Sequence, residues 1–106
     1  MPALAVSAAN LADADAALEW AAAREWSECV TKGPMGYTYR PQAPRAVALR
    51  GLTRIVTELD GSVPRGSAVA RLFESLVARQ PASIGGLVAR AMPDGWSVTK
   101  APVRRA

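Results

Sequence analysis

Few residues in this chain are of the types that carry out chemistry. The 106 residues include no histidine and one cysteine, Cys29. Histidine is the usual general base and the commonest metal ligand, so ordinary acid–base, nucleophilic and zinc sites are excluded. A serine–lysine pair would have only Lys32 and Lys100 to draw on. We therefore expect no catalytic residue, no metal site and no cofactor.

Two pairs of carboxylates are close enough in sequence to be considered as an acid–base or metal-binding pair. They are Asp13 with Asp15 and Glu25 with Glu28. On a helix such acids ordinarily face solvent, and a metal-dependent nuclease would need them beside a basic surface. These four lie in the acidic part of the chain, so the sequence predicts a protein that is not an enzyme.

The charges are distributed unevenly. Residues 1–32 hold five acidic and two basic residues, whereas residues 33–106 hold eleven basic and four acidic ones. One interpretation is internal, with an acidic first helix lying against a basic remainder. The other is a basic face for nucleic acid or for an acidic partner. A bias to arginine in a chain rich in alanine and glycine is also typical of a GC-rich genome.

The candidate binding residues are the arginines and aromatic residues of the basic part. Arginines would contact phosphates and aromatic rings would stack on bases, a combination that suits single-stranded DNA. The alternative is that the tyrosines cover the core and the arginines are only solvated. The candidates are Tyr37, Tyr39, Arg40, Arg45, Arg50, Arg54, Arg71, Arg79 and Trp96.

The elements that would position these residues follow from apolar spacing and from helix stop signals. Asn10 is a good N-cap for a helix to about Thr31, which Gly33-Pro34 would follow. In that helix Trp20 either packs on a second buried face, which is the preferred interpretation, or is exposed. A glycine- and proline-rich connection over 33–43 leads to a helix from Pro44 to Asp60, which Gly61 ends.

The stretch from Ser67 to Met92 carries two apolar stripes at the 3.6-residue period. They consist of Val69, Leu72, Phe73, Leu76 and Val77, then of Ile84, Leu87, Val88, Ala91 and Met92. With Pro81 between them, this spacing predicts two helices. Trp96 to Ala101 alternates like a strand and could pair with Tyr37–Arg40.

These elements predict an all-α bundle of about four helices, with at most a minimal two-stranded β-ribbon, in a single domain over 1–106 with loose termini at 1–9 and 102–106. No signal peptide or membrane span is expected, and a lone cysteine suits a reducing cytosol, so we predict a cytoplasmic monomer. A helix-turn-helix is disfavoured, because Pro93 to Ala101 would separate its helices.

In size, alanine-rich helices and charge layout, residues 1–106 resemble the small phage-encoded anti-CRISPR proteins that act on type I systems. That group has no common sequence signature, so no functional residue is carried over by position. The resemblance implies an inhibitor that binds a CRISPR surveillance complex or its single-stranded DNA. The alternatives are a small DNA-binding transcriptional regulator or antitoxin, which would dimerise, and a structural adaptor.

Overall fold

The structure is a computed structural model that describes residues 3–101, with side chains described from residue 9 onward. It consists of three helices and five strands. In chain order they are α1 (Ala3–Cys29), β1 (Val30–Lys32), β2 (Gly36–Tyr39), α2 (Arg45–Asp60), α3 (Gly66–Val77), β3 (Ala82–Ile84), β4 (Leu87–Met92) and β5 (Gly95–Lys100).

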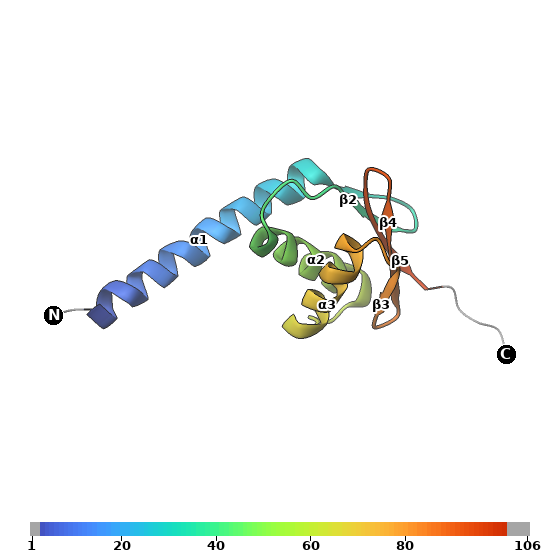
Figure 1. Cartoon of the computed structure of the whole chain (residues 1–106). Coiled ribbons are helices and arrows are strands. Elements are labelled where there is room, and N and C mark those ends of the chain that lie inside the picture. Colours follow the sequence, from blue (N-terminus) through green and yellow to red (C-terminus); the bar gives the residue numbers. More distant parts are fainter. Residues whose placement is uncertain (1–2, 102–106) are drawn as a thin grey trace.

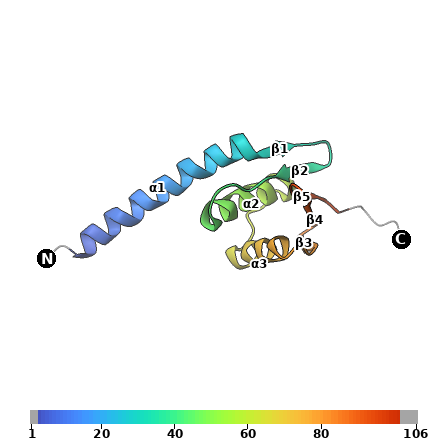
Figure 2. The same cartoon turned by 45° about the horizontal axis from the view of Figure 1, so that its top comes forward.

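The five strands form one antiparallel sheet in the order β1-β2-β5-β4-β3. Helices α2 and α3 pack on one face of this sheet, and α1 runs away from it (Figures 1 and 2). Paired residues of neighbouring strands share a face. The row Tyr37, Val98 and Ala89 therefore points into the core, where all three side chains are buried.

This α+β architecture shows that the predicted all-α bundle of four helices is wrong. The error lies in the segment after α3, where Ile84–Met92 forms strands rather than a fourth helix. β3 pairs with β4 across a tight turn at Gly85 and Gly86, and Gly85 has the positive φ of 57° that glycine adopts at no steric penalty. The burial of β4 alternates, with Leu87 and Ala89 inside, as in a strand with one face on the core.

Other predicted elements are confirmed. Helix α2 begins one residue after Pro44 and ends at Asp60, and Gly61 adopts the left-handed conformation that closes it. Its predicted apolar stripe is buried at Ala48, Leu52, Ile55 and Val56. Helix α3 buries Val69, Leu72 and Leu76, whereas Phe73 is half-buried and Val77 is exposed.

The predicted pairing of Tyr37–Arg40 with the last strand is confirmed for β2, which aligns Tyr37 with Val98 and Tyr39 with Trp96. It is not an isolated ribbon, because β1 extends it on one side and β4 and β3 on the other. The chain between α1 and α2 thus supplies two of the five strands.

Helix α1 begins at Ala3 rather than at Asn10, so residues 3–9 are helical and not a loose arm. The predicted loose ends at 1–2 and 102–106 lie outside the described residues. The first half of α1 projects from the body (Figure 1), and Leu11 and Trp20 are 72% and 66% exposed. The expected burial of Trp20 is therefore wrong. Within residues 3–101, no helix is long and apolar enough to cross a membrane.

Candidate nucleic-acid interface

Glu25 fastens the C-terminal half of α1 to the body. Its side chain is 7% exposed, and one carboxylate oxygen accepts hydrogen bonds from the Tyr39 hydroxyl at 2.7 Å and the Ala43 N–H at 3.0 Å. The Gln42 N–H and the Cys29 thiol donate at 3.2 Å each. The prediction that Glu25 faces solvent is therefore wrong. Glu25 follows Leu18 and Ala22 at helical spacing, and that apolar stripe was the sequence signal for its burial.

These hydrogen bonds shift the pKa of each group in the cluster. Burial acts to raise the pKa of Glu25, but the hydrogen bonds from Tyr39, Ala43, Cys29 and Gln42 outweigh it and lower the pKa below its usual 4.5. Burial and the hydrogen bond to the Glu25 carboxylate raise the pKa of the Cys29 thiol to about 11. The same two causes raise the pKa of Tyr39. The cluster therefore stays as one carboxylate held by neutral donors, an arrangement that anchors a helix.

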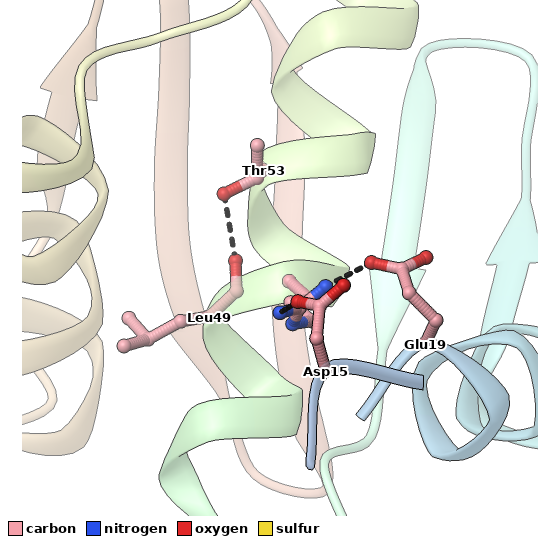
Figure 3. A network of polar contacts seen from close by, with 5 residues as sticks. Asp15, Glu19, Leu49 and Thr53 are labelled. Atoms are coloured by element: carbon pink, nitrogen blue, oxygen red, sulfur yellow. Dashed lines mark hydrogen bonds and ion pairs between the residues drawn. The ribbon is translucent and has the colours of Figure 1, made fainter. Parts of the chain in front are cut away.

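Arg50 of α2 lies against the acidic side of α1. Its guanidinium forms ion pairs with Asp15, at 2.6 Å, and with Glu19. Figure 3 shows the Asp15 and Glu19 carboxylates turned toward α2, the helix on which the Thr53 hydroxyl donates to the Leu49 carbonyl at 2.8 Å. For Arg50, the interpretation in which the acidic first helix lies against the basic remainder is therefore the correct one. Its guanidinium contacts α1 rather than a ligand.

Arg54, one turn further along α2, stacks over the ring of Trp26 with its guanidinium carbon 3.9 Å from the ring centroid. The two residues line a crevice of about 330 Å³ between α1 and α2. The two candidate binding residues of α2, Arg50 and Arg54, thus both contact α1. The charge of Arg50 is used within the molecule, whereas Arg54 is exposed and forms no ion pair among residues 9–101.

The three aromatic candidates belong to the core. Tyr39 is fully buried, and Tyr37 and Trp96 are each 8% exposed. The Trp96 ring meets those of Tyr39 and Phe73 edge to face, with centroids 5.7 and 5.6 Å apart. Tyr37 packs against Trp26. The interpretation in which these rings cover the core fits their positions, and stacking on bases does not.

Three of the nine candidates converge at the end of the sheet that holds the β4–β5 turn. Arg40, Arg79 and Trp96 line one pocket of about 220 Å³, together with Gln42, Asp94 and Gly95. We refer to it as the Arg79 pocket. Arg40 pairs there with Asp94 at 2.8 Å, with both side chains well exposed. Gly95 lets the chain pass close to β2, because a Cβ at this position would lie 2.8 Å from the Tyr39 carbonyl oxygen.

Arg45 and Arg71 lie apart from this pocket. Arg45 pairs with Glu74 at 3.4 Å and lies over the Phe73 ring, 5.4 Å from its centroid. Arg71 lines a groove of about 190 Å³ between α3 and β3, beside Ser75. Among residues 9–101, seven exposed cations form no ion pair and so retain their charge toward solvent: Lys32, Arg54, Arg65, Arg71, Arg79, Arg90 and Lys100.

No cluster that could hold a metal ion occurs among the described His, Cys, Asp and Glu residues. The arrangement that the structure does offer is a body on which seven of the described cations form no ion pair, joined to a helix, α1, that carries five acidic residues. Such a body can attract a polyanion and hold it through guanidinium–phosphate contacts.

Comparison with known proteins gives one informative similarity. The chain is 41% identical over 103 residues to a tRNA(Ile)-lysidine synthase from Novosphingobium aromaticivorans. The alignment covers 95% of this chain but 31% of that enzyme, so the chain spans about a third of its relative's length. No family model matches the chain, and no solved structure matches it.

Proposed function

We propose that this chain is an RNA-binding accessory domain whose ligand is a tRNA. The observation that carries the proposal is the similarity to one third of a tRNA(Ile)-lysidine synthase, which extends over nearly the whole of this chain. A domain that shares so much sequence with a third of a tRNA-modifying enzyme is a good candidate to hold the tRNA while another part performs the chemistry. Its role would be in the cytoplasm, where tRNA is modified.

The charges of the described residues support this role. Seven cations among residues 9–101 form no ion pair, whereas two acids of α1, Asp15 and Glu19, are paired with Arg50. Neutralising phosphates with arginine and lysine releases counterions, and this gives sequence-independent affinity for RNA. The scarcity of residues suited to acid–base chemistry, with no histidine in the chain, supports a binding role rather than a catalytic one.

Fluorescence anisotropy with a labelled tRNA(Ile) transcript tests the proposal, across a salt series and with light scattering on the same sample. We expect salt-dependent binding that is tighter for the tRNA than for a DNA duplex of equal length. Equal affinity for every polyanion, or no binding at low salt, would contradict a tRNA-binding role.

The same titration addresses the sequence-based hypotheses. A CRISPR inhibitor that acts on single-stranded DNA should prefer a single-stranded DNA oligonucleotide to the tRNA. A transcriptional regulator or antitoxin should dimerise and prefer a particular duplex. Neither the structure nor the comparisons bear on these two hypotheses, and both stay predictions.

A further inference from the structure

Helix α3 ends in a turn that usually requires glycine. The N–H of Arg79 donates to the Leu76 carbonyl at 3.0 Å, and the N–H of Gln80 donates to the Ser75 carbonyl at 2.8 Å. These two bonds define a Schellman motif in which the residue after the C-cap takes a left-handed conformation. Here that residue is Arg79, with φ of 61°.

Glycine takes this conformation elsewhere in the chain. Gly61, which ends α2, has φ of 85°, and Gly85 in the β3–β4 turn has φ of 57°. Among the described residues, Arg79 is the one position with positive φ that is not glycine. A residue other than glycine is uncommon in this region, and residues held in such conformations cluster at functional sites, where the side chain has a use.

The surroundings of Arg79 indicate what that use is. Arg79 lines the Arg79 pocket together with Arg40 and the largely buried Trp96. Arg79 forms no ion pair within residues 9–101, and Arg40 pairs with an exposed carboxylate, Asp94. Two arginines and one aspartate line this small pocket, so its lining has a net positive charge.

We propose that the Arg79 pocket binds one phosphate group of an RNA strand, with Arg79 and Arg40 as its two guanidinium ligands. A guanidinium donates two parallel hydrogen bonds to phosphate oxygens, so two arginines can satisfy a phosphate that bridges them. Asp94 holds Arg40 in place in the free protein, and the phosphate competes with it for that guanidinium. The proposal deepens the RNA-binding role and rests on it.

Arg79→Gly separates the binding role of this residue from its structural role. Glycine suits the left-handed turn, so thermal unfolding should occur at an unchanged or slightly higher temperature. Binding of the labelled tRNA(Ile) transcript should weaken about tenfold, since a charge-assisted contact is lost. The slope of log affinity against log salt should fall by about one.

Arg65→Gly is the matched control. Arg65 is an exposed arginine at the N-cap of α3 that forms no ion pair among the described residues, and N-caps tolerate glycine. It removes the same charge outside the pocket and so measures the loss that comes from diffuse charge alone, which we expect to be about two- to threefold in tRNA affinity and clearly smaller than the loss in Arg79→Gly. Arg79→Asn provides a second variant, because asparagine also accepts the left-handed region.

The outcomes are distinguishable. If Arg79→Gly and Arg65→Gly weaken binding equally, the affinity comes from diffuse charge, and the pocket proposal fails while RNA binding stands. If Arg79→Gly or Arg79→Asn binds as tightly as the original chain, the pocket proposal also fails. If the original chain does not bind the transcript at all, the proposed function itself fails. A large loss of thermal stability in Arg79→Gly would show that the arginine side chain serves the fold.

Discussion

At the scale of single residues, Glu25 explains how a solvent-facing helix is fixed to the body. One carboxylate receives four donors, two of them from the backbone of the loop that precedes α2. A buried carboxylate is stable only when it is hydrogen-bonded in this way. The Glu25 carboxylate therefore connects α1 to β2 and to the loop before α2. The stability of the contact between these three segments depends on the charge of Glu25.

Glu25→Gln should lower the free energy of unfolding at pH 7 by about 2 kcal/mol, because a neutral amide accepts weaker hydrogen bonds and turns its own N–H groups toward donors. Urea unfolding measures the change. Glu28→Gln is the control, since Glu28 is exposed and pairs only with Arg24, and it should change the free energy by less than about 0.5 kcal/mol. Equal losses in the two variants would contradict the anchoring role of Glu25.

The same pair of proteins should differ in pH dependence. The folded-state pKa of Glu25 is lowered, so its stabilising effect is fully present above its usual value of 4.5 and is lost as the pH falls through the folded-state pKa. The difference in unfolding free energy between the original chain and Glu25→Gln should therefore shrink below about pH 4.5. A difference that stays constant down to pH 3 would show that the carboxylate charge has no part in it.

Cys29 should react slowly with thiol reagents. Its pKa is raised to about 11 by burial and by the Glu25 carboxylate, so very little thiolate is present at neutral pH. We expect the rate with a disulfide reagent at pH 8 to be at least about tenfold lower in the native protein than in the protein unfolded in urea. Glu25→Gln should raise the native rate, since it removes the neighbouring negative charge. Equal native and unfolded rates would exclude the raised pKa.

At the scale of elements, the sheet depends on a close approach of β2 and β5. A Cβ at Gly36 would lie 2.1 Å from the Val98 carbonyl oxygen and 2.9 Å from the Thr99 Cα. Gly36→Ala must therefore push the two strands apart. We expect it to lower the free energy of unfolding by at least about 2 kcal/mol, measured by urea unfolding.

Gly86→Ala is the control for this prediction. A Cβ at Gly86 would have no atom within 4 Å, and φ there is not positive. The substitution should change the free energy of unfolding by less than about 1 kcal/mol. If the two alanine variants are equally stable, the strands are not in close contact at Gly36.

Comparison with the sheet and helices shows which elements could be predicted from the sequence. The stripe and the glycine stop of α2 predicted that helix closely, because both signals are local to the helix. The prediction of a helix over residues 84–92 was wrong because the segment fits two patterns. Leu87, Val88 and Ala91 fit the period of a helix, while Leu87, Ala89 and Ala91 fit the alternation of a strand. Gly85 and Gly86 decide between the two, and they favour a turn with strands on either side.

The candidate site was predictable to a smaller extent, since it depends on which arginines the fold brings together. Spacing along α2 predicts that Arg50 and Arg54 lie on one side of the helix, but it does not predict which neighbouring element that side contacts. The Arg79 pocket joins Arg40, which follows β2, to the turn after α3, and these segments meet only through the sheet order together with the packing of α3 on the sheet. The strain at Arg79 is a backbone property, which the residue type does not reveal.

At the scale of the whole molecule, α1 is divided into two parts. Its second half is fixed by the Glu25 hydrogen bonds, by the pairing of Asp15 and Glu19 with Arg50, and by packing on α2. Residues 9–14 are all exposed and lie before the first of these contacts. A helical segment without tertiary packing is only marginally stable in water.

Hydrogen exchange should therefore divide α1 in the same place. We expect the amides of residues 9–14 to exchange on the order of a hundredfold faster than those of 48–56, in the buried middle of α2, and protection to rise after Glu19. The measurement is hydrogen–deuterium exchange resolved by peptide, at low protein concentration. Strong protection of residues 9–14 would show that another surface covers this segment. Light scattering on the same sample would then show whether that surface is a second copy, which the prediction of a monomer excludes.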